Sequence, residues 1–236
     1  MSEAIDYGRR LSPAAAMDLA VELARRGPVV DANPRVGAVL LDADGRLVGG
    51  GHHHGAGSPH AEIAALTDFA ARAAETAAAA AAGRGAVTAY VTLEPCAHTG
   101  RTGPCAKALI RAGISRVVYA ESDPGRASGG GAAVLGAAGV AVEHTPHAGA
   151  HELNPYWRHA MLIGRPWVTW KFAATLDGRI AAADGTSRWI TSAQARADVH
   201  ALRAACGAVL IGTGTALADD PQLTVRVGGR RDGALA

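Results

Sequence analysis

A histidine and two cysteines, spaced so that a single metal ion can join them, constrain this chain more than any other feature. His60 stands two residues before Glu62, Cys96 follows Pro95, and eight residues separate Cys96 from Cys105. One imidazole and two thiolates supply three ligands to a tetrahedral zinc ion and leave its fourth position open, which is typical of a catalytic site. Any fold that binds zinc in this way must bring three separate segments of the chain to one point.

Glu62 indicates which chemistry such a site would perform. A carboxylate beside a metal-bound water can carry protons from the attacking oxygen to the leaving amine, as in zinc deaminases that act on aminopyrimidines. We therefore expect hydrolytic deamination, with Glu62 catalytic and His60, Cys96 and Cys105 as zinc ligands. The plain alternative is a capping histidine and two buried thiols that serve as small apolar side chains. The order of the four residues favours the zinc site.

Longer motifs surround these residues. TLEPCAHTGRTGPC at 92–105, NPRVG at 33–37 and GSPHAE at 57–62 resemble the deaminase half of the bifunctional deaminase-reductases of riboflavin biosynthesis. KFAATLDGR at 171–179, SRWITS at 187–192 and ADDP at 218–221 resemble the reductase half of the same family. The resemblance covers nearly the whole chain, and it implies deamination of a ribosylaminopyrimidine phosphate followed by reduction of its ribose to ribitol.

The resemblance also implies two α/β domains. Residues 1–150 would form a cytidine-deaminase-like three-layer domain, and residues 151–236 the N-terminal part of a dihydrofolate-reductase-like domain that uses NADPH. Family members continue well beyond Ala236, so we expect a truncated form or fragment. Its reductase domain would lack sheet strands and a glycine-rich cofactor segment. On this basis deamination should survive while reduction is weak or absent.

In the deaminase half, the resemblance assigns Asn33, His53 and His98 to contacts with the pyrimidine or its ribose phosphate. Each residue also has a simpler interpretation. Asn33 precedes a proline in a turn-prone segment, and His53 is one of three consecutive histidines that could be solvated. Relatives tend to read Asp-Pro-Asn-Pro where this chain has DPGR at 123–126, so one asparagine contact is absent. Arg126 is not assigned a role.

In the reductase half, the resemblance separates a cofactor side from a substrate side. The NADPH side would comprise Ala173, Trp189, Thr215 and Asp219. The substrate side would comprise Lys171, Ser187, Arg203, Leu223 and Arg226, whose cations suit a phosphate or a polarised sugar oxygen. The alternatives are a core role for Trp189 and a solvated helix position for Arg203. A Rossmann fingerprint is excluded, because Leu217 stands where the pattern begun by Gly212 and Gly214 needs glycine or alanine.

Composition and length exclude several other classes. The 236 residues suit two modest domains, and 49% of them are apolar although only 4% are aromatic. A net charge of +2 is too small to indicate a nucleic-acid partner. Without a signal sequence or an uninterrupted run of about 18 apolar residues, we expect a cytoplasmic protein with no membrane partner. We also expect a homo-oligomer. Three cysteines, two of them proposed ligands, argue against a disulfide framework and leave Cys206 as a packed thiol.

Helix and strand patterns alternate along the chain. In the first half we expect helices at 13–26, 60–82, 104–112 and 132–138, strands at 36–41, 87–93 and 116–120, and a strand that ends at the glycines 49–51. In the second half we expect strands at 168–174 and 208–211 around a helix at 192–206. This alternation predicts an α/β sheet with helices on its faces.

Two other function classes stay open. A nucleoside or nucleic-acid base deaminase with an unrelated tail would need a basic groove and stacking aromatics, both scarce here. A non-enzymatic, zinc-stabilised interaction domain would need a fourth protein ligand. Zinc content and ammonia release from candidate pyrimidines would separate the three classes.

Overall fold

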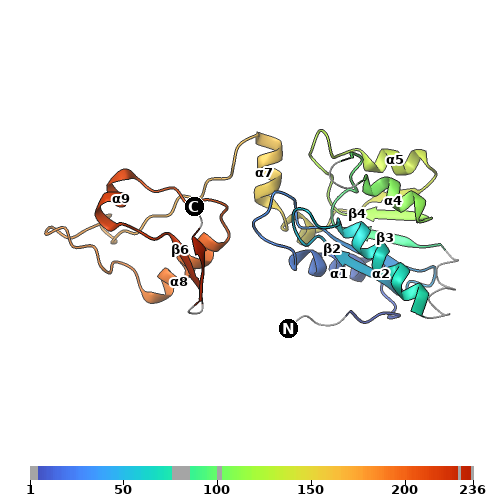
Figure 1. Cartoon of the computed structure of the whole chain (residues 1–236), viewed down its shortest axis with the longest axis horizontal. Coiled ribbons are helices and arrows are strands. Elements are labelled where there is room, and N and C mark those ends of the chain that lie inside the picture. The colour runs from blue at the N-terminus through green and yellow to red at the C-terminus, as the bar shows by residue number, and fades with distance from the viewer. Residues whose placement is uncertain (1–4, 76–85, 100–102, 228–229, 235–236) are drawn as a thin grey trace. The chain divides into compact units, whose positions relative to one another are not determined.

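The chain divides into two compact units, Met1–Trp167 (unit 1) and Val168–Ala236 (unit 2). The computed structural model describes residues 5–75, 86–99, 103–227 and 230–234 (Figure 1). The domain boundary expected at residue 150 stays a prediction. None of the helices in the described part of the chain is long and apolar enough to cross a membrane.

Unit 1 contains a five-stranded mixed sheet in the order β2-β1-β3-β4-β5. The strands are β1 (Gly37–Leu41), β2 (Leu47–His52), β3 (Thr88–Val91), β4 (Arg116–Tyr119) and β5 (Ala141–His144). β1 is antiparallel to both β2 and β3, whereas β3, β4 and β5 are parallel. The start of β1 therefore lies at the same edge as the carboxyl ends of β3 and β4, and this edge carries the site described below.

Helices cover both faces of the sheet, which gives three layers (Figure 1). α1 (Pro13–Arg25) and the short α6 (Ala148–His151) pack on one face, while α2 (Ala61–Glu75), α4 (Cys105–Arg111) and α5 (Gly131–Ala137) cover the other. α7 (Pro155–Ile163) ends the helical part of unit 1. The predicted cytidine-deaminase-like three-layer α/β arrangement is confirmed.

Local sequence explains where several of these elements begin. Ser12 caps α1, its hydroxyl oxygen accepting a hydrogen bond from the Ala15 backbone N–H at 3.2 Å, and Pro13 occupies the first helical turn. Gly37 is required at the start of β1, because a Cβ there would lie 1.9 Å from the Ala20 carbonyl oxygen of α1. Close packing of α1 on the sheet depends on that glycine.

The expected elements of unit 1 are present, and where both ends are described the ends differ by no more than two residues. The helix expected at 60–82 is described as far as Glu75, and residues 76–82 lie outside the described part. β5 was not predicted, since its four residues alternate too briefly to be separated from the histidine- and proline-rich stretch that follows.

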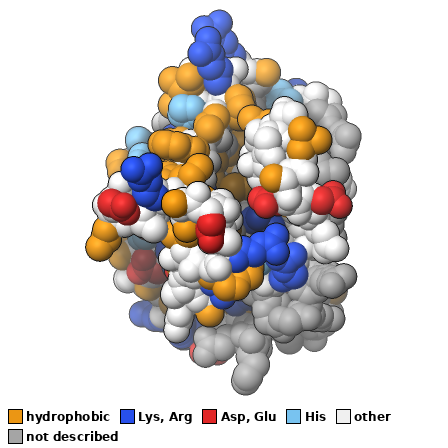
Figure 2. Space-filling view, turned by 90° about the vertical axis from the view of Figure 1, so that its left-hand side faces the viewer, with side chains coloured by type: hydrophobic (Ala, Val, Ile, Leu, Met, Phe, Trp, Pro, Cys, Tyr) orange, Lys and Arg blue, Asp and Glu red, His pale blue; other side chains and the backbone are white. Residues whose placement is uncertain are grey.

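Unit 2 contains two helices and a hairpin, α8 (Ala193–Ala204), α9 (Thr213–Asp219), β6 (Thr224–Val227) and β7 (Arg230–Ala234). The helix expected at 192–206 is confirmed, and Ser192 caps it through the Ala195 backbone N–H at 3.1 Å. The strands expected at 168–174 and 208–211 are wrong for this structure, because neither segment pairs with another strand among the described residues. Many apolar side chains of the chain lie at the surface (Figure 2).

Candidate metal centre and active site

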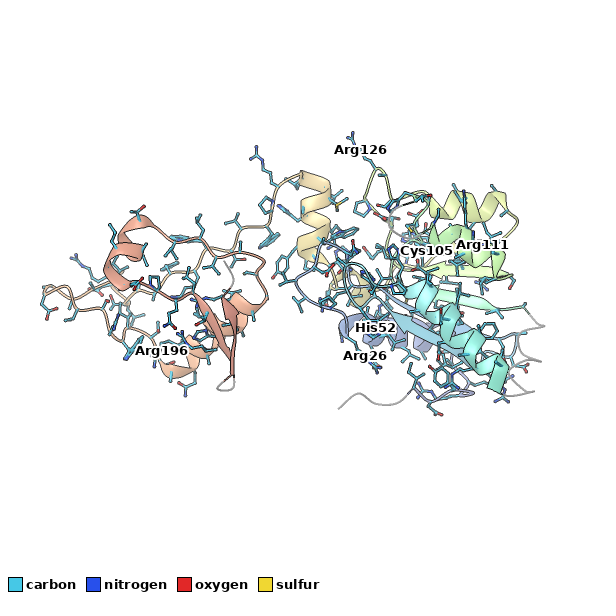
Figure 3. The ribbon with its side chains drawn as sticks, in the orientation of Figure 1. Arg26, His52, Cys105, Arg111, Arg126 and Arg196 are labelled. Atoms are coloured by element: carbon cyan, nitrogen blue, oxygen red, sulfur yellow. The ribbon has the colours of Figure 1, made fainter. Side chains whose placement is uncertain are left out.

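Three structural elements bring the predicted zinc ligands together. His60 lies directly before α2, and Cys96 lies in the loop after β3. Cys105, labelled in Figure 3, is the first residue of α4. The Nδ1 atom of His60 is 3.3 Å from the Cys105 Sγ and 3.7 Å from the Cys96 Sγ, and all three ligand atoms lie within 4.8 Å of one another. Tetrahedral zinc, with bonds of about 2.3 Å to sulfur and about 2.0 Å to nitrogen, would separate such atoms by about 3.6 Å. The geometry therefore fits zinc.

The loop that carries Cys96 is held from two sides. Its Cys96 Sγ accepts a hydrogen bond from the Cys105 backbone N–H at 3.4 Å. The first residue of α5, Gly131, lies against the Pro95 carbonyl oxygen so closely that a Cβ at this position would be 1.6 Å from that oxygen. A glycine is thus needed for α5 to approach the metal-binding loop.

The electrostatics of the cluster favour a bound cation. A hydrogen bond with the Cys105 thiol lowers the pKa of Cys96 to about 4, and a further hydrogen bond with His60 acts in the same direction. The pairing with Cys96 raises the pKa of Cys105, while the hydrogen bond to Cys96 raises the pKa of His60. One sulfur of the pair is therefore a thiolate at neutral pH, and a thiolate is the form that binds metal.

Glu62 lies in the first turn of α2 beside this cluster. Its side chain is only 4% exposed, and burial raises its pKa to about 7. The carboxyl group lies close enough to the Cys105 thiol for each of the two groups to affect the pKa of the other. A carboxyl group with a pKa near neutrality can accept and return a proton at pH 7, as general acid–base chemistry requires.

The cluster opens into a cavity of about 520 Å³. Of the residues predicted for the deaminase half, all but Cys105 line it: Asn33, His53, His60, Glu62, Cys96 and His98. The His53 Nδ1 is 3.0 Å from the Pro59 carbonyl oxygen, so it carries the proton and leaves Nε2 to accept from the Asn33 side-chain amide at 3.1 Å. The buried Nδ1 of His98 has no hydrogen-bond partner among the described residues.

Strand pairing explains why Asn33 reaches the metal-binding loop. The buried Thr92 hydroxyl, just beyond β3, accepts from the Gly37 backbone N–H at 3.2 Å, and the Thr92 N–H donates to the Gly37 carbonyl at 3.1 Å. The segment before β1 is thereby fixed beside the loop after β3. This pairing joins sites that lie 55 residues apart in the sequence.

The sequence analysis missed a second group of cavity residues. These are Glu94, Asp123, Ser128, Trp157 and Met161. The Glu94 carboxylate accepts from the backbone N–H groups of Ala132 at 3.0 Å and Asp123 at 3.3 Å, and burial raises the pKa of Asp123. Glu94 and Asp123 follow adjacent parallel strands, a position from which they were predictable. Arg126, in contrast, is exposed and lies outside the cavity lining (Figure 3).

The predicted reductase residues all lie in unit 2, mostly at its surface. Arg203 of α8 donates to the Thr224 carbonyl oxygen at 2.8 Å, and Arg226 of β6 donates to the Thr224 hydroxyl at 2.9 Å, so these two cations are near each other. Leu223 lies directly before β6, and Thr215 and Asp219 belong to α9. Trp189 is 70% exposed and stacks under the Arg196 guanidinium. Lys171 and Ser187 are exposed and Ala173 is half-buried, all in irregular segments.

Comparisons with known proteins match both halves of the chain. Residues 12–121 match the family model described as the cytidine and deoxycytidylate deaminase zinc-binding region, and residues 166–233 match the RibD C-terminal domain. The curated riboflavin biosynthesis protein RibD of Mycobacterium tuberculosis is 49% identical, over 86% of this chain and 56% of its own length. RibD of Escherichia coli K12 is 47% identical, over 89% of this chain and 55% of its own length.

Solved structures agree with these matches. Acinetobacter baumannii RibD superposes with a TM-score of 0.77 and 44% identity, covering 91% of this chain and 58% of its own. A diaminohydroxyphosphoribosylaminopyrimidine deaminase/5-amino-6-(5-phosphoribosylamino)uracil reductase from Thermotoga maritima gives a TM-score of 0.75 and 39% identity, covering 90% and 59%. The chain spans about half the length of the curated relatives it matches. With a zinc-binding deaminase region followed by RibD C-terminal sequence, it belongs to the RibD family.

Proposed function

We propose that unit 1 is a zinc-dependent deaminase of riboflavin biosynthesis. It would convert 2,5-diamino-6-(5-phosphoribosylamino)pyrimidin-4-one to 5-amino-6-(5-phosphoribosylamino)uracil, releasing ammonia. The observation that carries this proposal is the buried Glu62 carboxyl beside the His60, Cys96 and Cys105 cluster, at the inner end of a cavity. The name of the Thermotoga maritima relative supports this choice of substrate.

The residues of the cavity have separate roles in this reaction. Zinc held by His60, Cys96 and Cys105 would supply the Lewis acidity that makes water nucleophilic near neutral pH. Glu62 accepts the proton of the attacking water and delivers it to the departing amino group, so the carboxyl group returns to its starting state. Asn33 and His53, which are hydrogen-bonded to each other, orient the ring, and His98 offers an unpaired ring nitrogen to the substrate. Water enters, ammonia leaves, and a ring carbonyl replaces the C–NH₂ group.

The partners we propose follow from the same site. The substrate is a small phosphorylated pyrimidine, and nucleic acid and membranes are not partners. We further propose that the enzyme works in the cytoplasm as a homo-oligomer. Sedimentation of the purified protein with and without the substrate tests its oligomeric state.

Unit 2 carries the residues proposed for an NADPH-dependent reductase that converts the ribose to ribitol. Among the described residues, Trp189 of the proposed NADPH side is largely exposed, and the two cations of the substrate side, Arg203 and Arg226, both bind Thr224. An enclosed site is needed to position a cofactor for hydride transfer. We therefore derive no reduction step, and we expect this chain to release ammonia while its oxidation of NADPH is weak or absent.

A single assay tests both proposals. The pyrimidine substrate and NADPH are supplied together, and ammonia release and nicotinamide absorbance are followed at the same time. We expect ammonia release that is abolished by a zinc chelator and restored by zinc. No ammonia from the zinc-loaded protein would refute the deaminase, and NADPH oxidation coupled to a ribitol product would refute the proposed absence of reduction. Cytidine and deoxycytidylate, added separately, test the alternative of a nucleoside or nucleotide deaminase.

A further inference from the structure

α7 supplies one wall of the deaminase cavity. Trp157 and Met161, four residues apart and therefore on the same face of the helix, line the cavity together with His60 and Glu62. Trp157 also lines a second, much smaller cavity with Leu93 and Pro124. The indole therefore borders both cavities.

The start of α7 is fixed to the segment before β1, which also carries the cavity residue Asn33. The Asn154 side chain accepts from the Arg35 backbone N–H at 2.8 Å and donates to the Arg35 carbonyl oxygen at 2.8 Å. The Arg35 guanidinium in turn donates to the Leu153 carbonyl oxygen at 2.5 Å. Arg35 lies two residues beyond Asn33, so this double hydrogen bond sets the distance between α7 and the polar side of the cavity.

A second anchor holds α7 to the end of β4. The Arg158 guanidinium lies 3.6 Å from the Glu121 carboxylate and donates to the His151 carbonyl oxygen at 2.9 Å. On the outer side of α7, the rings of Tyr156 and His159 pack against Trp167 at centroid distances of 5.6 and 5.2 Å. Trp157 thus faces the cavity while its neighbours in the helix make the contacts that hold α7 in place.

The two sides of the cavity differ in chemistry. Asn33, His53, Glu94 and Asp123 supply polar groups, whereas Trp157 supplies the largest flat apolar surface. Heteroaromatic rings stack favourably on aromatic side chains, and every ring offers a face for such a contact. We propose that Trp157 is a specificity residue whose indole packs against the face of the planar aminopyrimidine presented to the metal centre, with Met161 completing the wall. The identity of the ring rests on the proposed deaminase function.

The test compares Trp157→Ala, Trp157→Leu and Trp157→Phe with the matched control Trp167→Ala, which removes a tryptophan from the outer side of α7. Calorimetry with 2,5,6-triaminopyrimidin-4-one, which lacks the ribose phosphate, measures ring binding by the zinc-loaded protein. Ammonia release gives KM and kcat. We expect Ala and Leu to weaken ring binding and raise KM about 10-fold or more, with kcat and zinc content little changed. Phe should stay within about 3-fold of wild type, because it keeps an aromatic face.

The outcomes separate this inference from the proposed function. If the wild-type protein binds the ring but releases no ammonia, the proposed function fails, and a loss of ring binding in Trp157→Leu still supports the stacking role. Wild-type ring affinity in Trp157→Leu, with zinc retained, would overturn the inference even if deamination is normal. A wild-type protein that does not bind the ring overturns it too. If Trp167→Ala weakens ring binding as much as Trp157→Ala does, displacement of α7, and not loss of the indole face, causes the effect.

Discussion

Units 1 and 2 come from one chain but differ sharply in what they bury. Unit 1 packs apolar side chains on both faces of its sheet, in two separate cores. In unit 2, Leu210 is 97% exposed and Trp170 81%, and Val225 is the one hydrophobic side chain that is buried among its described residues. Apolar side chains are therefore buried in unit 1 and mostly exposed in unit 2. The difference depends on whether the segments that carry them pair with a neighbouring strand.

Serine caps begin helices in the same way in both units. Ser12 and Ser192 cap α1 and α8 with nearly the same distance to the third residue of the helix, 3.2 and 3.1 Å. Segment 168–174, in contrast, contains strand-forming residues but pairs with nothing among the described residues. A helix satisfies its backbone internally, whereas a strand depends on a neighbour. Capping residues and hydrophobic periodicity are therefore enough to predict a helix. A sheet also requires a partner strand, which these local signals do not identify.

The largest effect should come from removing a zinc ligand of unit 1. Cys96→Ser should lose most bound zinc and all measurable deamination, because a neutral hydroxyl is a poor replacement for a thiolate. The matched control is Cys206→Ser in unit 2, which should retain both. Metal analysis and ammonia release are the measurements. Full zinc occupancy with normal turnover in Cys96→Ser would remove the chemical distinction between the units.

Glu62→Gln should be the next largest effect. The amide keeps the size of the carboxyl group but cannot shuttle a proton, so kcat should fall by about 10²-fold or more while zinc content persists. Glu22→Gln, an exposed position on α1, is the control and should leave kcat unchanged. Unchanged turnover in Glu62→Gln would mean that another group in unit 1 is the base.

A pair of leucine truncations compares the packing of the two units directly. Leu40→Ala in β1 should lower the free energy of unfolding of unit 1 by about 2–5 kcal/mol, because it empties a fully buried position. Leu210→Ala should change the free energy of unfolding of unit 2 by less than about 0.5 kcal/mol, as expected for an exposed side chain. Denaturant unfolding followed by circular dichroism measures both. Similar losses would show that unit 2 packs its apolar side chains after all.

The smallest effects should come from the two helix caps. Ser12→Ala should destabilise unit 1 by about 1 kcal/mol. Ser192→Ala removes an equivalent hydrogen bond, but with little packing to couple α8 to its surroundings we expect only local loss of helix at 193–204. Hydrogen exchange resolves the two cases. A change in protection that spreads from α8 across unit 2 would indicate a cooperative core there.

Sequence reasoning was most successful where chemistry restricts the choice of residue. His60, Cys96, Cys105 and Glu62 stood out because their types and order match one metal chemistry, and the resemblance to a known family added Asn33, His53 and His98. Trp157 was not predicted to line the cavity, because nothing local connects a helix at 155–163 with metal ligands that lie 50 or more residues earlier in the sequence. The assigned roles of the site residues themselves stay predictions.

The sequence was least informative in unit 2. Periodicity marked α8 correctly and suggested strands at 168–174 and 208–211, but a period-2 pattern shows only that a segment suits a sheet. The partner strand is a long-range property. Arg203 and Arg226 were grouped by family resemblance, and in the structure both of them donate hydrogen bonds to Thr224.

The pairing of Gly37 with Thr92 has a kinetic consequence. This contact spans 55 residues, the Arg35–Asn154 contact spans 119, and the His60–Cys105 approach spans 45. Contacts between distant residues carry a loop-closure cost and form slowly compared with helices. We therefore expect tight zinc binding to follow these closures, so the rate of metal uptake by refolding protein should report a late step of sheet assembly.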